Sequence, residues 1–369
     1  MTSTRKTIYE ELREQGITRR EFLKIATAIT LSLGLKLNMV PRVAKAMETR
    51  PRVPVIWLEF QSCTGCTESF IRSFQPDMQK VLFEVVSLEY SEALMAGSGT
   101  VADEHIKKIM EEYPGEYILA AEGSLPVLAG TLTIAGRPAV ELFREVAAKA
   151  KAVVSMGSCA SWGGISAARP NPTLAKAVTD FVPPGVPFIR LPGCPPIAEV
   201  MTNTLAHIVL FGTLPEVDEL ARPKAYYRHR IHDKCQRRAF FDAGLYAEKF
   251  NDEGARQGYC LYKLGCRGPT TYAACAELRW NGGLSWPVQS GHPCIGCAAP
   301  NFWDQSPFYA RVAKLPGTQT TIQPERVGAM MAGALAAGIA VHAAATVIAK
   351  GRITKRSEVQ APADAGAGQ

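Results

Sequence analysis

The stretch Val55-Ile56-Trp57-Leu58-Glu59-Phe60-Gln61-Ser62-Cys63-Thr64-Gly65-Cys66-Thr67-Glu68 joins a short apolar run to a Cys-x-x-Cys turn. The run at residues 55–60 has the length and composition of a buried β-strand. Two thiols three positions apart can turn toward one centre, and Gly65 between them lets the backbone approach it closely. A single Cys-x-x-Cys fits a redox disulfide, a zinc site or half of an iron–sulfur site. The choice among these three depends on the spacing of the other eight of the ten cysteines.

Apolar runs of strand type alternate with helical patterns through the first two-thirds of the chain. Strands are expected at residues 55–60, 81–88, 116–121, 152–156 and 187–191, and helices at 139–150, 173–181 and 197–211. This alternation predicts an open α/β fold with a doubly wound parallel sheet. Ligands bind at the carboxyl edge of such sheets. Four thiols that follow strands should therefore converge there: Cys63, Cys66, Cys159 and Cys194.

The stretch from about residue 222 to 308 shows little periodicity and holds six of the ten cysteines. A stretch this long without regular structure needs something else to hold it together, and bound metal clusters would do so. Its candidate ligands form two sets. The first set is His232, Cys235, Cys260 and Cys266, and the second is Cys275, Cys294 and Cys297. Pro287 stands before Cys294, where a fourth ligand of the second set would be expected.

Zinc and disulfides are the alternatives to iron–sulfur clusters. Tetrahedral zinc sites of four cysteines, or of three cysteines and one histidine, are common. Their ligands usually come in two tight pairs, whereas these sets are spread over loops, and a three-thiol set fits zinc poorly. Five disulfides would use all ten cysteines, but a chain of 369 residues has enough core to do without them. The spacing therefore favours iron–sulfur clusters.

The charge of the chain is concentrated at its two ends. The formal net charge is +7, of which +5 falls in residues 1–46 and +2 in residues 350–369. The stretch between them is neutral, so it lacks the basic face that nucleic-acid binding needs.

The N-terminus has the pattern of an export signal. Thr18-Arg19-Arg20-Glu21-Phe22-Leu23-Lys24 is a twin-arginine pattern, a mildly apolar run follows at 25–35, and Ala44-Lys45-Ala46 is a small-x-small cleavage site. We expect a twin-arginine signal peptide over residues 1–46 and a mature chain that begins at Met47. The alternative is an ordinary amphipathic helix with two arginines. Twin-arginine signals export folded proteins, so cysteines of an exported chain need not form disulfides.

An apolar run of 23 residues lies at 327–349, with His342 as its strongly polar member. At about 1.5 Å per helical residue it spans a hydrocarbon core of roughly 30 Å. Four basic residues follow: Lys350, Arg352, Lys355 and Arg356. By the positive-inside rule we expect a transmembrane anchor over 327–349 and a cytoplasmic tail over 350–369. The alternative is a buried core helix rich in alanine and glycine.

The cysteine motifs are shared with a known family. In chain order they are Cys63-Thr64-Gly65-Cys66-Thr67-Glu68, Gly157-Ser158-Cys159-Ala160-Ser161-Trp162-Gly163-Gly164, Pro192-Gly193-Cys194-Pro195-Pro196, His232-x2-Cys235, Cys260-Leu261-Tyr262-Lys263-Leu264-Gly265-Cys266-Arg267-Gly268-Pro269 and Gly291-His292-Pro293-Cys294-Ile295-Gly296-Cys297. The chain resembles the small subunit of membrane-bound nickel–iron uptake hydrogenases. The resemblance runs from about residue 18 to the end and fills all eleven ligand positions in order.

The resemblance implies a flavodoxin-like domain over 47–215 and a cluster domain over 216–315. It implies a proximal [4Fe–4S] cluster on Cys63, Cys66, Cys159 and Cys194, and a distal [4Fe–4S] cluster on His232, Cys235, Cys260 and Cys266. It also implies a medial [3Fe–4S] cluster on Cys275, Cys294 and Cys297, with Pro287 excluding a fourth iron.

The implied function is electron transfer in a heterodimer that oxidises H2 to protons and electrons. The nickel–iron centre would belong to a separate large subunit, so no catalytic residue is expected on this chain. Electrons would leave to a cytochrome b or another quinone-linked acceptor in the inner membrane, with the protein on the periplasmic side. The alternatives are a stand-alone iron–sulfur electron carrier and a zinc-stabilised binding protein.

A few residues near these motifs have more than one interpretation. Oxygen-tolerant members of the family carry two additional cysteines beside the proximal cluster, where this chain has Gly65 and Gly164. The resemblance therefore implies the oxygen-sensitive standard type. Glu68 and Glu122 lie in loops near the proximal site, where they could assist proton movement or only stabilise the loops through hydrogen bonds. His342 could approach a haem of a membrane partner.

Overall fold

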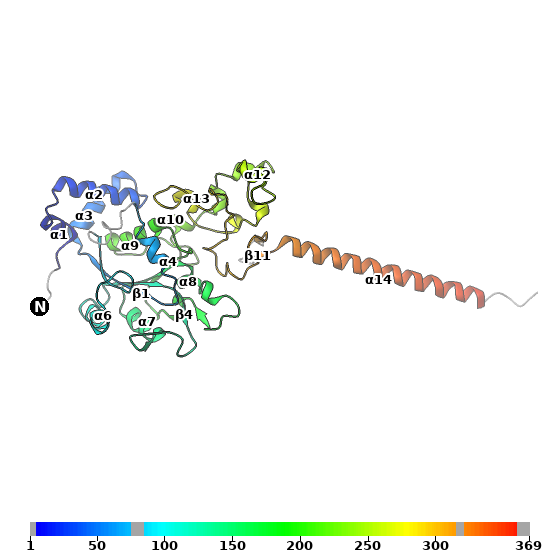
Figure 1. The fold of residues 1–369 in the computed structure, drawn as a ribbon, viewed down its shortest axis with the longest axis horizontal. Helices are drawn as coiled ribbons and strands as arrows, with labels where there is room; N and C mark the ends of the chain where they lie inside the picture. Colours follow the sequence, from blue (N-terminus) through cyan, green and yellow to red (C-terminus); the bar gives the residue numbers. More distant parts are fainter. Residues whose placement is uncertain (1–4, 75–84, 315–320, 360–369) are drawn as a thin grey trace, which may run out of the picture. The chain divides into compact units, whose positions relative to one another are not determined.

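A five-stranded parallel sheet forms the centre of the first part of the chain (Figure 1). The computed structural model describes residues 5–74, 85–314 and 321–359. The strand order is β2-β1-β3-β7-β9, which is the 2-1-3-4-5 order of flavodoxin-like sheets. The strands are β1 (Val53–Glu59), β2 (Val86–Ser91), β3 (Ile118–Glu122), β7 (Ala152–Met156) and β9 (Phe188–Leu191). The predicted parallel α/β sheet is therefore confirmed, except that residues 81–84 of the expected second strand lie outside the described residues.

Helices cover both faces of this sheet, because alternate side chains of its strands point to opposite faces. Ile56 and Leu58 of β1 belong to one hydrophobic cluster, and Val55 and Trp57 belong to the other. Figure 1 shows α6 (Thr100–Glu112) and α7 (Ala139–Ala148) on one face, and α4 (Gly65–Phe70) and α9 (Ala198–Phe211) on the other. The short α8 (Gly157–Trp162) follows β7 directly.

The predicted helix at 173–181 is wrong. The segment contains β8 (Ala175–Lys176), which pairs with β4 (Leu125–Pro126), and the 3-10 turn η4 (Val178–Phe181). Leu174 has a φ of 53°, which no helix allows, and the Asn171 side chain hydrogen-bonds both backbone groups of Ala175. Local side-chain bonds and strand pairing thus override a weak helical pattern. Three further short elements lie nearby: β5 (Thr133–Ile134), β6 (Arg137–Pro138) and η3 (Ile165–Ala167).

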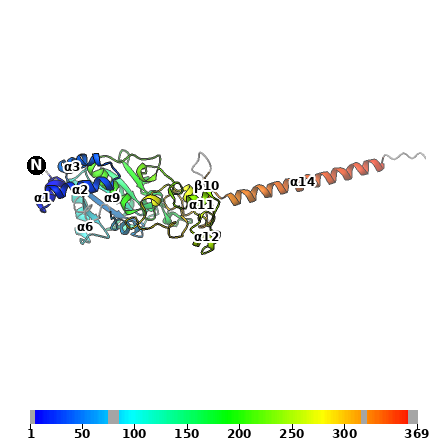
Figure 2. The same ribbon diagram turned by 90° about the horizontal axis from the view of Figure 1, so that it is seen from above.

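Of three N-terminal helices, the second and third pack on α9 and the first packs on the other two (Figures 1 and 2). They are α1 (Ile8–Glu14), α2 (Arg19–Ser32) and α3 (Val40–Thr49), with the 3-10 turn η1 (Leu37–Met39) before α3. Phe22, Ile29 and Val43 are almost completely buried in the main hydrophobic cluster. Asn203 of α9 donates a 2.7 Å hydrogen bond to the carbonyl of Ser32. The expected cleavage site Ala44-Lys45-Ala46 lies inside α3.

The segment between α9 and residue 310 consists of loops and short helices. These are α10 (Lys224–Tyr227), η5 (Ile231–Lys234), α11 (Arg238–Asp242), α12 (Glu253–Arg256), η6 (Tyr262–Leu264), η7 (Gly268–Thr270) and α13 (Cys275–Leu278). The expected lack of periodicity is confirmed. Tyr227, Trp286 and Val288 of this segment share one hydrophobic cluster with Leu205 of α9, so the segment packs on the sheet domain.

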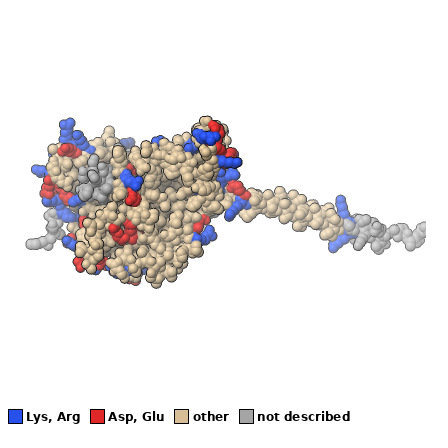
Figure 3. All heavy atoms as spheres, viewed as in Figure 1, with Lys and Arg blue, Asp and Glu red and all other residues tan. Residues whose placement is uncertain are grey.

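Residues Arg311–Gln369 form a separate compact unit. Its described elements are the antiparallel pair of β10 (Ala313–Lys314) and β11 (Thr321–Ile322) and the long helix α14 (Pro324–Val359). Between Arg326 and Lys350 the helix carries no charged residue, and its surface is uncharged there (Figure 3). Among the described residues, one helix has the length and apolar composition to cross a membrane, and it is this one. Its apolar side chains, such as Leu335 and Ile339, are largely exposed.

Candidate metal centres

Four thiols meet at the carboxyl edge of the sheet. Cys63 and Cys66 follow β1, Cys159 lies in α8 after β7, and Cys194 follows β9. All four line one recess, together with Glu122 from the end of β3. None of them is disulfide-bonded. The parallel sheet thus places three separate loops around one site, as its topology requires.

The surroundings of Cys66 and Cys194 in this recess disfavour ionisation of their thiols. Burial first, and then the charges of Glu122 and the other three cysteines, raise the pKa of Cys66 well above its ordinary value. Burial, followed by the charge of Cys297, raises the pKa of Cys194 to about 12. Metal cations reverse this preference, because a coordinating thiol is deprotonated outright. The donor set therefore fits a positively charged metal group.

Two glycines leave room for the sulfur atoms. Gly157 has a φ of 87°, and a Cβ atom there would lie 2.4 Å from the Cys66 Sγ. Gly164 has a φ of 63°, and a Cβ atom there would lie 2.3 Å from the Cys159 Sγ. In the conformation that these loops adopt here, both positions favour glycine, by backbone angle and by space.

Glu122 holds the Cys66 turn in place. Its Oε1 accepts a 3.0 Å hydrogen bond from the Cys66 backbone N–H. Its Oε2 accepts from the Thr67 backbone N–H at 3.0 Å, from Thr67 Oγ1 at 2.7 Å and from Trp57 Nε1 at 3.3 Å. With 1% of its surface exposed, the carboxylate is fully engaged in positioning α4. The structure thus supports the hydrogen-bonding interpretation of this residue, which the sequence left open.

The second site is surrounded mostly by apolar side chains. One cavity of about 160 Å³ is lined by Cys275, Cys294, Cys297 and Pro287, and its walls also include Cys194. Burial raises the pKa of Cys294 well above its ordinary value. Burial also raises the pKa of Cys275 to about 12, with a further contribution from Cys297. The three thiols again suit a metal group rather than free thiolates.

The third set lies farther along the irregular segment. Burial, with smaller contributions from the charges of Cys260 and Cys235, raises the pKa of Cys266 to about 11. His232 stands three residues before Cys235 in η5 and packs its ring against Phe241 at 4.5 Å. Burial, followed by the charge of Arg238, lowers the pKa of His232. A neutral imidazole is the form that binds a metal.

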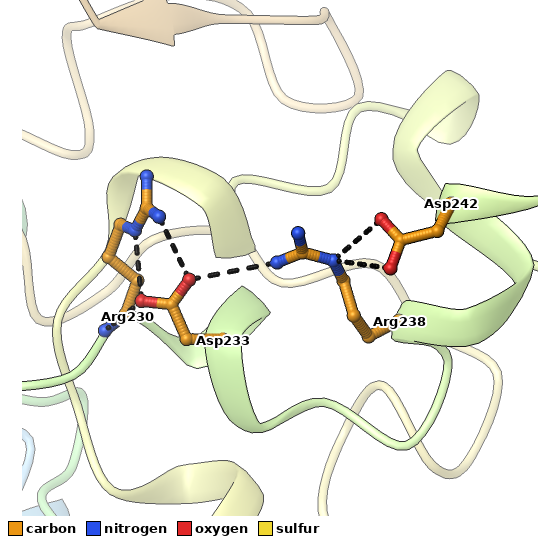
Figure 4. A network of polar contacts seen from close by, with 4 residues as sticks. All are labelled: Arg230, Asp233, Arg238 and Asp242. Carbon is orange, nitrogen blue, oxygen red and sulfur yellow. Dashed lines mark hydrogen bonds and ion pairs between the residues drawn. The ribbon is translucent and has the colours of Figure 1, made fainter.

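A network of ion pairs borders this third set (Figure 4). Arg230 Nη2 lies 2.9 Å from Asp233 Oδ1, and Arg238 Nε lies 2.8 Å from Asp242 Oδ1. Arg238 also reaches Asp233 at 3.8 Å. The network ties η5, which carries His232, to α11. Because these side chains are partly exposed, the pairs fix local geometry more than they add stability.

The three sets contact one another in a row. Ser158, next to Cys159, donates a short hydrogen bond to the carbonyl of Cys297, and it accepts one from the Gly193 N–H at 2.9 Å. At the other end, the Cys294 N–H donates to the Cys266 Sγ at 3.3 Å. The set of Cys275, Cys294 and Cys297 therefore lies between the other two. The sequence motifs contained Ser158 without indicating this role.

Single-ion sites do not account for the thiols. Within the described parts of the chain, no three His, Cys, Asp or Glu side chains are placed to hold one metal ion.

A parallel α/β sheet with one cysteine set at its edge, linked to two more sets in the segment that follows, is typical of a metal-containing redox protein. Comparison with known families agrees: residues 63–208 match the family "NADH ubiquinone oxidoreductase, 20 Kd subunit". Residues 227–309 match the family of C-terminal domains of the NiFe/NiFeSe hydrogenase small subunit.

Individual relatives are similar over nearly the whole chain. The uptake hydrogenase small subunit of Azotobacter vinelandii is 49% identical, over 93% of this chain and 96% of the relative. The hydrogenase-1 small chain of Escherichia coli K12 is 48% identical, over 93% and 92%. A chain of the [NiFeSe] hydrogenase of Desulfomicrobium baculatum is 36% identical, with a TM-score of 0.64 over 70% of this chain and 98% of that chain. The chain belongs to the family of small subunits of nickel–iron hydrogenases. It is thus a subunit of an oxidoreductase whose active site lies on the large subunit.

Proposed function

We propose that this chain carries electrons from H2 oxidation through three iron–sulfur clusters to an acceptor in the membrane. Cys63, Cys66, Cys159 and Cys194 would hold the proximal [4Fe–4S] cluster. His232, Cys235, Cys260 and Cys266 would hold the distal [4Fe–4S] cluster. Cys275, Cys294 and Cys297 would hold the medial [3Fe–4S] cluster, with Pro287 at its vacant corner. When bound, each cluster supplies a reversible one-electron redox centre.

The observation that carries this proposal is the row of contacts between the three sets. Ser158 joins the first set to the second through the carbonyl of Cys297. The hydrogen bond from Cys294 to Cys266 Sγ joins the second set to the third. Such contacts shorten the path between neighbouring redox centres, and they make the order proximal, medial, distal the natural one. The alternative of a stand-alone carrier is disfavoured, because the relatives are hydrogenase small subunits along almost their full length.

In this proposal, the two ends of the chain determine where in the cell the protein is located. Residues 1–46 act as a twin-arginine signal, and residues 327–349 anchor the protein to the inner membrane from the periplasmic side. The sheet domain spans 47–215, the cluster domain 216–315 and the cytoplasmic tail 350–369. The acceptor is a cytochrome b or another quinone-linked partner. Lys350 and Arg352 follow the apolar part of α14, and this supports the orientation.

Metal analysis of the membrane-extracted heterodimer tests the proposal. We expect nickel to be present together with about eleven irons on this chain, four at each [4Fe–4S] site and three at the [3Fe–4S] site. Electron paramagnetic resonance (EPR) of the oxidised enzyme should show one [3Fe–4S] signal. Zinc in place of iron, or iron without a nickel-containing partner, would contradict the proposal.

A further inference from the structure

Arg267 has a buried guanidinium that forms no ion pair with any carboxylate in the described residues. The residue is 1% exposed. Its Nη1 donates to the carbonyls of Ile295, at 3.2 Å, and Phe302. Its Nη2 donates to the carbonyl and the hydroxyl of Ser306, at 2.8 and 2.9 Å, and to the carbonyl of Pro307 at 3.3 Å. The side chain thus satisfies its hydrogen bonds with neutral groups and keeps its full positive charge inside the protein.

Another buried arginine shows what ordinary compensation looks like in this chain. Arg222 is 6% exposed, and its guanidinium lies 2.7 Å from the carboxylate of Asp218. A buried charge without such a partner is costly, so it persists only where something else neutralises it. The Arg267 guanidinium is instead held by the loop that carries Cys294 and Cys297, two of the proposed ligands of the middle site.

The backbone places Arg267 against the middle cysteine set. Its N–H donates to the carbonyl of Cys294 at 2.7 Å. Gly296, between Cys294 and Cys297, lies close to the Arg267 side chain. A Cβ atom at this position would be 3.1 Å from the Arg267 Cδ. Together with the bond to Ile295, these contacts wrap the loop of residues 294–297 around the arginine side chain.

We propose that Arg267 is the buried counter-charge of the site formed by Cys275, Cys294 and Cys297, and that it raises the reduction potential of the group bound there. This inference rests on the proposed function. Each added electron makes the site more negative, and a fixed nearby cation in a medium of low dielectric constant stabilises that state. The same side chain positions the thiols by bonding their loop.

The first test removes the charge. EPR-monitored redox titration of the purified heterodimer should show a lower midpoint potential for the middle site in Arg267→Gln. Arg267→Lys keeps the positive charge but lacks the planar guanidinium, so its midpoint potential should be closer to that of the unaltered enzyme. The double variant Asp218→Asn/Arg222→Gln is the control. It removes a buried guanidinium together with its carboxylate, so the net charge is unchanged and the potential should not move.

A second test leaves the arginine in place and so does not depend on folding of the Arg267 variants. Ser306→Asp puts a carboxylate beside Nη2, where the serine hydroxyl now lies at 2.9 Å. It should also lower the midpoint potential, whereas the neutral variant Ser306→Asn should not. An unchanged or raised potential in Ser306→Asp overturns the inference, whatever Arg267→Gln does. If the unaltered oxidised enzyme shows no [3Fe–4S] EPR signal, the proposed function itself is overturned instead.

Discussion

At the scale of single residues, the sequence predicted which side chains gather but not how they are held. Cys63, Cys66, Cys159 and Cys194 could be placed together because each follows a strand of one parallel sheet. The links made by Ser158 and Arg267 could not be predicted. They depend on loops far apart in the chain, and no local periodicity describes such contacts.

Pro287 gives a prediction about cluster type. Its side chain lines the same cavity as Cys275, Cys294 and Cys297. Pro287→Cys should supply a fourth thiolate, convert [3Fe–4S] to [4Fe–4S] and lower the potential of the medial site. The oxidised [3Fe–4S] EPR signal should then vanish, while the control Pro287→Ala should keep it. A folded Pro287→Cys variant that retains the signal would show that this residue is not at the vacant corner.

Glu122 gives a prediction about stability at the proximal site. Glu122→Ala leaves the backbone N–H groups of Cys66 and Thr67 without their acceptor. Each orphaned buried group costs about 1–3 kcal/mol. We expect a lower Tm and loss of iron from the proximal site. Glu68→Ala is the control, because Glu68 is exposed and its ion pair with Arg72 is a surface one. Equal iron content and Tm in both variants would contradict the positioning role of Glu122.

Gly65 and Gly164 give a prediction about oxygen. Neither can ligate iron, so the proximal cluster should be an ordinary one that cycles between two states. We expect H2 oxidation to stop reversibly in air and to return after reductive activation. Protein-film voltammetry under low O2 measures this, and a sustained H2-oxidation current would count against the oxygen-sensitive type.

At the scale of elements, buried strands were predictable because continuous apolar runs are typical of parallel sheets. The structure of segment 173–181 was not predictable in this way. Its strand β8 forms by pairing with the distant β4, and a local sequence pattern holds no information on such pairing. The short helices that carry His232 and Cys275 also lack a sequence pattern of their own. Long-range hydrogen bonds and, in our proposal, bound clusters determine their positions.

Helix α14 gives a prediction about location. Ending the chain before Val327 should release the enzyme from the membrane with its H2–dye activity intact, because the metal sites lie outside this helix. Activity with the quinone-linked acceptor should fall. A chain that ends after Lys350 is the control and should sediment with membranes. Membrane-bound protein without residues 327–349 would show that α14 is not the anchor.

At the scale of the whole molecule, the N-terminal helices α1, α2 and α3 are part of the hydrophobic core, although the sequence predicts a removable signal. The two descriptions agree if the signal packs on α9 until export. Thr18 and Glu21 form a capping box at the start of α2, so the twin arginines begin a stable helix.

This packing can be tested in the unprocessed precursor. Ile29→Asp puts a charge at a site that is 1% exposed, which costs about 3 kcal/mol and should release α2 from α9. Hydrogen exchange of the α2 amides should then become fast. Leu31→Asp, at a neighbouring position that is 54% exposed, should leave the exchange slow. Fast exchange in the unaltered precursor would mean that α2 does not pack on the body.

The conformation at Gly164 also bears on how oxygen tolerance can be gained or lost in evolution. At position 65 a Cβ atom would meet the Cys63 Sγ at 3.1 Å, a contact that a small shift relieves. At position 164 the φ of 63° and the 2.3 Å approach to the Cys159 Sγ oblige the backbone to move together with an existing ligand. A cysteine at position 65 therefore requires only a small shift of one side chain, whereas a cysteine at position 164 requires the loop after Cys159 to change its backbone conformation. A route to oxygen tolerance that adds both cysteines would have to remodel this loop first.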